Sequence, residues 1–237
     1  MLTPDVVADL APGGVLRAAI NLGNPVLAQG TPAEPAGVAV DIARAIASRL
    51  GVRAQFACFT AARDSFEAMM TGRADICFLA IEPAREAEVA FTAPYVLIEG
   101  VYAVPEESPL RTVEDVDGPG VRIGVKHGSA YDLFLSRTLL HATVVRGTEG
   151  TDEFLARNLE AAAGVREPVT EFVRTHPGVR LIEGRFMQIR QAVGTAKTKR
   201  RETTRFLHGV VEELKASGFV ADALRRSGQS APVAPPG

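Results

Sequence analysis

The sequence predicts an α/β protein with largely parallel sheets. Short apolar runs typical of buried strands alternate along the chain with segments whose apolar residues recur at helical spacing. A glycine ends two of these helical segments, at Gly51 and Gly72, as expected of a C-terminal cap. The 237 residues, 46% of them hydrophobic and 23% charged, are enough for one large domain or two small ones.

The first part of the chain contains three predicted strands and two predicted helices. In order, they are a strand at 15–22, a helix at 38–50, a strand at 52–59, a helix at 61–72 and a strand at 74–81. The first helix places Val40, Ala43 and Ile46 on one face, and the second helix predicts Met69 and Met70 in the core. A further short helix, led by Thr3, is predicted at 3–10.

A second series of alternations follows a long extended segment at 94–108 that is interrupted by Gly100. It comprises a turn-rich connector at 112–120, strands at 121–125, 142–147, 159–165 and 179–184, and helices at 130–139, 151–158 and 167–178. After residues 186–195, a long helix at 200–218 and a shorter one at 219–228 precede the tail 229–237. We expect this proline-rich tail to be disordered.

Charge and hydropathy exclude several classes of partner. The formal net charge is -2, from 26 basic and 28 acidic residues, so the chain has no electrostatic footprint for nucleic acid. The basic cluster at 197–205 is interpreted as a solvated helix start. No apolar stretch reaches the roughly 20 residues that span a bilayer, so we expect no membrane insertion.

The cysteines and histidines predict neither a metal site nor a cofactor. Cys58 and Cys77 lie in apolar, strand-like runs, where a free thiol behaves as a small hydrophobe, and a disulfide between them stays an open alternative. The four histidines are not at ligand spacing. The N-terminal residues show no export signal, so the sequence as written predicts a cytoplasmic protein, or a periplasmic one if a signal precedes it.

One acidic and one basic residue follow the third predicted strand directly. In "FLAIEPAREAEVAFTAPY", residues 78–95, the apolar run ends at Glu82 and Pro83, and Arg85 comes next. Loops at the carboxyl ends of parallel strands are where α/β proteins bind ligands. The pair is therefore either part of a binding site or a surface ion pair.

Three segments give the chain a resemblance to a known family. "GVAVDIARAIASRLG", the run "FEAMMTGRADICFLAIEPAREAEVAFTAPY" and the later "GVKHGSAYDLFL" resemble the amino-acid-type solute-binding proteins of ABC transporters, family 3. The resemblance implies the type II periplasmic-binding fold, with two lobes, a ligand cleft between them and hinge closure on the ligand. Lobe 1 would comprise residues 1–104 and 192–237, and lobe 2 residues 105–191.

The resemblance also implies which residues contact the ligand. In lobe 1, Arg85 matches the arginine that binds the ligand's α-carboxylate, a role that suits its planar fork of donors. Ala80 and Ile81 match the strand end whose backbone carbonyl groups face the ligand.

In lobe 2, Gly128, Ser129 and Ala130 match a helix start whose backbone N–H groups favour an anion. The segment "LEAAAGVREPV" resembles the strand and loop of the opposite wall of the site.

The chain departs from the family pattern at three places. Glu82 stands where a threonine or serine hydroxyl is usual. Val165 and Arg166 stand near the position of the aspartate that pairs with the ligand's ammonium group, and Asn24 lies in a loop where an aromatic lid is common. Two interpretations of Glu82 stay open: it receives the ammonium group, which we favour, or it pairs with Arg85.

These observations predict non-catalytic binding of a small carboxylate-bearing metabolite, an amino acid or a relative of one. The implied partners are this ligand and an ABC transporter permease, and a monomer is expected. One alternative is a cyclohexadienyl (prephenate or arogenate) dehydratase-like enzyme, with Glu82 as general acid. Another alternative is an intracellular ligand-sensing module.

Overall fold

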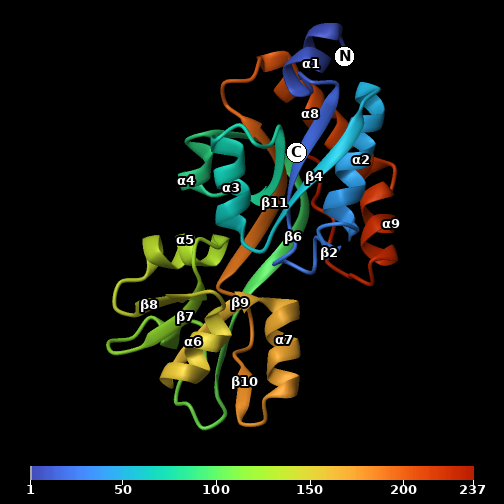
Figure 1. Cartoon of the computed structure of the whole chain (residues 1–237). Coiled ribbons are helices and arrows are strands. Elements are labelled where there is room, and N and C mark those ends of the chain that lie inside the picture. Colours follow the sequence, from blue (N-terminus) through green and yellow to red (C-terminus); the bar gives the residue numbers. More distant parts are fainter. Residues whose placement is uncertain (1) are drawn as a thin grey trace. The chain divides into compact units, whose positions relative to one another are not determined.

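The computed structural model describes residues 2–237, which form two compact units (Figure 1). Unit 1 runs to Leu97 and resumes at Arg190, and unit 2 is Ile98–Ile189. Strands β6 (Val89–Pro105) and β11 (Met187–Ala196) each have residues in both units. The predicted boundaries, after residues 104 and 191, fall within these same strands, and the assignment of the units as domains stays a prediction.

Unit 1 is an α/β unit in which each of three parallel strands is followed along the chain by a helix. Its remaining elements are α1 (Pro4–Leu10), β1 (Val15–Asn21), β2 (Gln29–Gly30), β3 (Pro35–Ala36), α2 (Val38–Leu50), β4 (Arg53–Phe59), α3 (Ala62–Met70), β5 (Ile76–Ala80), α4 (Pro83–Glu86), α8 (Arg201–Ala216) and α9 (Phe219–Arg226). The sheet order is β4-β1-β5-β11, with β1 parallel to β4 and β5. The carboxyl ends of these three strands therefore lie at one edge, and the predicted strands are confirmed.

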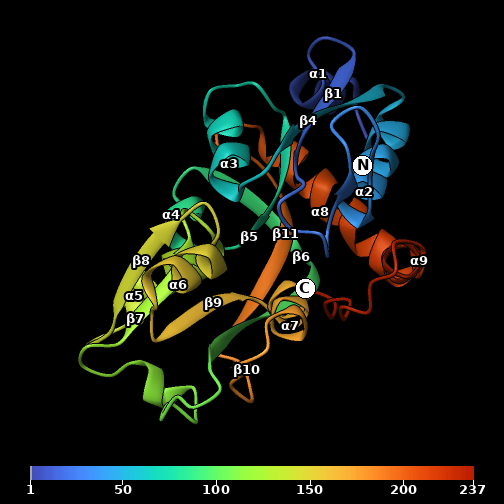
Figure 2. The same ribbon diagram turned by 60° about the horizontal axis from the view of Figure 1, so that its bottom comes forward.

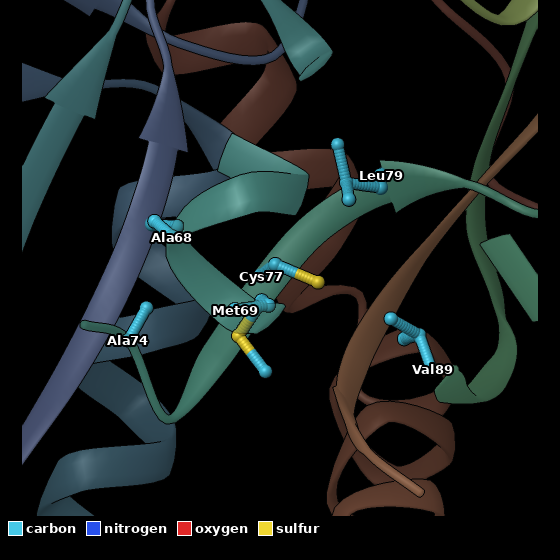
Figure 3. Packing of buried hydrophobic residues seen from close by; sticks show 7 residues of the cluster. Ala68, Met69, Ala74, Cys77, Leu79 and Val89 are labelled. Atoms are coloured by element: carbon cyan, nitrogen blue, oxygen red, sulfur yellow. The ribbon is translucent and has the colours of Figure 1, made fainter. Parts of the chain in front are cut away.

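Helices cover both faces of the unit 1 sheet. Figure 1 shows α2, α8 and α9 on one face and α3 on the other. The α3 side buries Met69 together with Cys77 and Leu79 of β5, as Figure 3 shows. The prediction that Met70 belongs to the core is wrong, because it is exposed. Adjacent residues point about 100° apart on a helix, so the single packed face of α3 buries one of the two methionines.

The C-terminal tail is ordered, which corrects the expectation of disorder. Val233 forms an antiparallel bridge with Val96, flanked by hydrogen bonds from the Leu97 N–H to the Pro232 carbonyl (3.0 Å) and from the Ala234 N–H to the Tyr95 carbonyl (3.1 Å). Figures 1 and 2 both show the segment after α9 returning toward β6. A proline-rich composition indicates weak self-structure, but the tail obtains its hydrogen bonds from the edge of β6.

The basic segment at 197–205 has specific partners and is not merely solvated. The Asp9 carboxylate of α1 accepts hydrogen bonds from the Arg200 N–H (3.0 Å) and the Thr203 hydroxyl (2.5 Å), and so caps the start of α8. Lys199 contacts the Asp9 backbone carbonyl. Burial alone would raise the pKa of Asp9, but its hydrogen bonds to Thr203 and Arg200 hold that pKa below its usual value. The prediction that Thr3 leads the first helix is confirmed.

Unit 2 is a second α/β unit. Its remaining elements are η1 (Glu114–Val116), β7 (Arg122–Lys126), α5 (Ala130–Thr138), β8 (Thr143–Gly147), α6 (Gly150–Arg157), β9 (Ala161–Val165), α7 (Arg166–Thr175) and β10 (Val179–Leu181). The strand order is β8-β7-β9-β6, with β10 on β6. Because β7 is parallel to β8 and β9, the carboxyl ends of these three strands share an edge, as in unit 1.

The helices of unit 2 are held by two sets of side chains. On one face, Phe154 of α6 meets Phe172 of α7 edge to face, above Ala162 of β9. Elsewhere in unit 2, Phe186 stacks on Tyr102 of β6 and contacts Phe134 of α5. These contacts hold α5, α6 and α7 near the strands whose ends carry the predicted site residues.

Candidate ligand-binding site

The loop at the end of β5 results from two neighbouring residues, Glu82 and Pro83. A residue before proline is disfavoured in helical conformation, and Glu82 is extended, with φ -137° and ψ 140°. Pro83 then occupies the first position of α4, where its missing N–H costs nothing. The sequence Glu-Pro therefore ends the strand and turns the chain so that Arg85 follows one short helical step later.

Arg85 is buried, with only 3% of its surface exposed. Its Nη1 donates to the Ala80 carbonyl at 3.2 Å, so the side chain folds back over the end of β5. Burial lowers the pKa of Arg85 to about 10, and the nearby Cys77 and Glu82 oppose this effect. The guanidinium group is therefore charged at neutral pH, in an environment where an anion would be bound with little competition from water.

Glu82 is buried to the same degree, 3% exposed, beside this arginine. Its backbone carbonyl accepts the N–H groups of Arg85 (2.8 Å) and Glu86 (2.9 Å), which begins α4. Its negative charge acts on Arg85, as the pKa of the arginine records. The loop thus presents one buried cation and one buried anion, a combination that matches the two charged groups of an amino acid.

The other predicted contacts of unit 1 lie at the same edge. The Ala80 carbonyl is engaged by Arg85, and the Ile81 N–H donates to the Arg190 carbonyl of β11 at 2.9 Å. Asn24 follows β1, whose end is beside that of β5, and its Oδ1 accepts the Val26 N–H at 3.3 Å. Asn24 shapes its own loop, so its side chain is tied to local structure.

In unit 2, the predicted helix start follows β7. Gly128 has φ +70°, in the left-handed region that favours glycine, which turns the chain from β7 into α5. The Ser129 hydroxyl accepts the Asp132 N–H at 3.0 Å and caps the helix. The Gly128 N–H donates to the Asp132 carboxylate at 2.8 Å, so this amide is engaged within the loop. Ala130 and Tyr131 provide the next two N–H groups of the helix start.

Val165 and Arg166 lie where β9 meets α7, at the edge that also carries the end of β7. Val165 is the residue before α7 and bears no charge that could pair with an ammonium group. Arg166 donates through Nε to Glu99 (2.5 Å) and through Nη2 to the Gly184 carbonyl (2.6 Å). The pKa of Glu99 is lowered by its bonds to Arg185 and Arg166, so this carboxylate stays ionised and holds Arg166.

Two ion pairs at the edge of unit 2 are formed by residues that were not predicted as site residues. Asp132 of α5 is bound by Arg146 of β8 at 2.9 Å, and Lys126 at the end of β7 is bound by Glu149. The spacing Ser129-x-x-Asp132 is that of a capping box, which is a signal that the sequence does carry. The long-range partners, Arg146 and Glu149, come from other strand ends and follow only from the topology.

The described part of the chain contains no group of three or more His, Cys, Asp or Glu side chains placed to hold a metal ion. Within residues 2–237, no helix is both long enough and apolar enough to cross a membrane. Cys58 and Cys77 are both free thiols. Burial raises the pKa of Cys77 to about 12, so it remains a protonated core residue at neutral pH.

The fold and these strand-end loops define the class of α/β ligand-binding proteins, and the sequence fixes the family. Residues 16–228 match the model of the bacterial extracellular solute-binding proteins, family 3. The chain belongs to this family. Its predicted family and its predicted fold class, the type II periplasmic-binding fold, are confirmed.

Solved structures show the same fold over nearly the whole chain. A mutant of ArgBP from T. maritima has 23% identity and a TM-score of 0.76, covering 94% of this chain and 99% of that one. An amino acid ABC transporter substrate-binding protein from Streptococcus pneumoniae Canada MDR_19A, bound to L-arginine, has 17% identity and a TM-score of 0.77, covering 97% and 100%.

A third similar solved structure is that of an ancestral protein. It is the ancestral amino acid-binding protein AncCDT-1, a precursor of cyclohexadienyl dehydratase, with 18% identity and a TM-score of 0.76, covering 94% of this chain and 98% of that one. No curated protein matches the sequence. At these identities the solved structures establish the fold, and the ligand has to be argued from the site residues.

Proposed function

We propose that this protein binds an amino acid, or a close relative that carries both a carboxylate and an amine, as the substrate-binding component of an ABC transporter. The buried guanidinium group of Arg85 is the observation that carries the proposal. A ligand carboxylate can accept two hydrogen bonds from the planar fork of a guanidinium group, and such charge-assisted bonds are strong where water is excluded. Two of the similar solved proteins, a mutant of ArgBP from T. maritima and the protein from Streptococcus pneumoniae, are bound to arginine, which supports the ligand class.

The ligand carboxylate would also be bound by the start of α5. The N–H groups of Ala130 and Tyr131 carry the positive end of the helix dipole. The Gly128 N–H has a smaller part than the resemblance implies, because it already donates to Asp132. Closure of the two units on the ligand, as the resemblance implies, would bring Arg85 and this helix start to one carboxylate.

Glu82 is proposed as the partner of the ligand ammonium group. It is buried at the end of β5, and Val165, which stands near the position of the family's usual aspartate, bears no charge. Pairing with the ligand and pairing with Arg85 are two arrangements of the same charges. We favour the ligand, because Arg85 is then available to the carboxylate.

The first experiment is to identify what the protein retains. Protein purified without added ligand is denatured, and the released small molecules are analysed by mass spectrometry. The protein, refolded free of ligand, is then titrated by calorimetry with each of the twenty common L-amino acids and with their des-amino analogues. We expect one amino acid, or a small group of them, to bind with a strong requirement for the carboxylate. Absence of any carboxylate-dependent binding would contradict the proposal.

A dehydratase-like activity is the second candidate. The buried Glu82 is the observation that favours it, because desolvation and a nearby substrate anion can turn a carboxyl group into a general acid. The similarity to a dehydratase precursor is consistent with it. Incubation with prephenate or arogenate, followed by assay for the aromatic product, separates the two candidates, and we expect no turnover.

Two further features belong to this proposal. A permease would be the macromolecular partner, and the protein would act as a monomer. Its place of action would be outside the cytoplasm, which the description of the family as extracellular supports. Size-exclusion chromatography with light scattering tests the monomer, and we expect a mass near the 25.1 kDa of the chain.

A further inference from the structure

Asp132 is a buried carboxylate at the base of the helix start proposed to bind the ligand. Only 2% of this residue is exposed. Its Oδ2 accepts the Gly128 N–H at 2.8 Å, and its own N–H donates to the Ser129 hydroxyl at 3.0 Å. The side chain therefore fixes the turn between β7 and α5, and it also places a negative charge next to the proposed site of an anion.

Arg146 of β8 neutralises this carboxylate. Its Nε donates to both oxygens of Asp132, at 2.9 Å and 3.1 Å. Its Nη2 donates to the Ser136 hydroxyl at 2.6 Å, and that hydroxyl donates to Oδ1 of Asp132 at 3.1 Å. The Gly128 N–H of the turn, the Ser136 hydroxyl of α5 and Arg146 of β8 thus converge on one carboxylate, and Arg146 is the member of this group that carries a positive charge.

We propose that Asp132 and Arg146 are positioning residues for ligand binding: Asp132 holds the helix start in shape, and Arg146 removes the repulsion that Asp132 would exert on a ligand carboxylate. This inference rests on the proposed function and deepens it. An acid in the first turn of a helix is favourable for the helix itself, since it meets the positive end of the dipole. A second anion at the N–H groups of Ala130 and Tyr131 would meet both the dipole and the Asp132 charge.

The electrostatic field that a ligand carboxylate meets at the helix start therefore depends on Arg146. The ion pair of Lys126 with Glu149, at the end of β7, is internally compensated and contributes little net charge. Two unit charges a few ångströms apart in a partly buried site interact strongly enough to change an affinity by about tenfold or more. A cap and an ion pair that served only the stability of α5 would show no such effect on ligand binding.

The test measures anion binding at the helix start directly, so that it does not depend on knowing the natural ligand. The full-length protein is titrated with acetate at constant ionic strength, and the amide shifts of Ala130 and Tyr131 are followed by NMR. The same variants are titrated with the amino acid that the calorimetric survey identifies. Amide spectra and thermal unfolding confirm that each variant is folded.

Four variants separate charge from structure. Arg146→Met is expected to weaken acetate binding about tenfold or more, and Arg146→Lys to stay within about threefold of the natural protein. Asp132→Asn retains an oxygen for the Gly128 N–H but no charge, so it should bind acetate at least as tightly as the natural protein. In the double variant of Asp132→Asn and Arg146→Met, affinity should recover to within about threefold of the natural value. The recovery is the informative result, since a second structural loss would weaken binding further.

Arg122→Met is the matched control. Arg122 lies on the neighbouring strand β7, is exposed to a similar extent and makes an equivalent forked contact with Glu160, away from the helix start. It should leave acetate binding unchanged. If Arg146→Met binds normally, or if the double variant is weaker than Arg146→Met, the inference is overturned while the proposed function stands. If the natural protein shows no acetate-dependent shift at Ala130 and Tyr131, the proposed role of the helix start and this inference fail together.

Discussion

The two units present similar edges with different chemistry. At the strand ends of unit 1, recognition would depend on charged side chains, Arg85 and Glu82, both buried. At the strand ends of unit 2, Arg166, Lys126 and Asp132 each have a charged partner within the unit, and the groups that can meet a ligand are backbone N–H groups.

The same architecture would therefore bind a ligand through charged side chains in one unit and through backbone donors in the other. Side-chain charges set which ligand is accepted, and one substitution can remove them. Backbone donors persist through most substitutions, so they provide affinity without selectivity for the side chain of the ligand. We therefore expect substitutions of the site residues in unit 1 to change binding most, and substitutions in unit 2 to change it less, with Arg146 having the largest effect among them.

The largest expected effect is that of Arg85→Ala. It removes the buried cation, and ligand binding should weaken by several kcal/mol, because the ligand carboxylate then loses its desolvated partner. Calorimetry with the identified amino acid measures the loss. Arg190→Ala, which removes an exposed charge from the strand beside Ile81, is the control and should bind normally. Normal binding by Arg85→Ala would show that the comparison assigns the wrong residue.

Removal of the tail should have the next largest effect, on stability and in unit 1. A chain ending at Gly228 loses two hydrogen bonds to β6 and the burial of Ala231 and Ala234. We expect the free energy of unfolding to fall by about 2 kcal/mol. Hydrogen exchange should show lost protection at Leu97, whose N–H donates to the tail, and unchanged protection in β7 of unit 2. Pro236→Ala keeps both bonds and serves as control, and equal loss in both units would contradict the assignment.

Ser129→Ala should have a smaller effect, because it removes a cap and leaves the backbone donors. We expect a loss of about 1 kcal/mol in the free energy of unfolding, and a smaller change in ligand affinity. Denaturant unfolding and calorimetry on the same samples measure the two quantities. An affinity loss as large as that of Arg85→Ala would mean that the hydroxyl itself binds the ligand, and would break the contrast between side-chain and backbone recognition.

The smallest expected effect concerns Glu99 in unit 2 and depends on pH. Arg185 and Arg166 lower its pKa below the usual 4.5. A lowered carboxyl pKa means that the stabilising contribution is present above about pH 4.5 and is lost as the pH falls through the folded-state value. In Glu99→Gln, the free energy of unfolding should therefore be lower than in the natural protein at pH 7, by about 1 kcal/mol or less, and the difference should shrink steadily as the pH falls below 4.5. A difference that does not shrink as the pH is lowered would indicate a cause other than the charge.

The sequence predicted the alternation of strands and helices well, because the buried strands and amphipathic helices have strong local patterns. It also placed Glu82 and Arg85 directly after a strand, and this is confirmed because β5 ends at Ala80. It failed for the tail, whose order depends on the edge of β6 far away in the sequence. It also could not supply Arg146 as the partner of Asp132, because that contact depends on strand order. The ligand contacts carried over from the family stay predictions.

The proposed pairing of Glu82 with the ligand ammonium group can be tested by comparing two ligands in the natural protein and in one variant. The identified amino acid and its analogue lacking the amine are titrated into the natural protein and into Glu82→Thr. Glu86→Gln is the control, because it removes an exposed carboxylate from the same short helix, α4, and leaves Glu82 in place. We predict that the natural protein and Glu86→Gln strongly prefer the amine, and that Glu82→Thr loses most of this preference while it still requires the carboxylate. If Glu82→Thr discriminates as well as the natural protein does, the ammonium group is bound elsewhere and the account of this site is wrong.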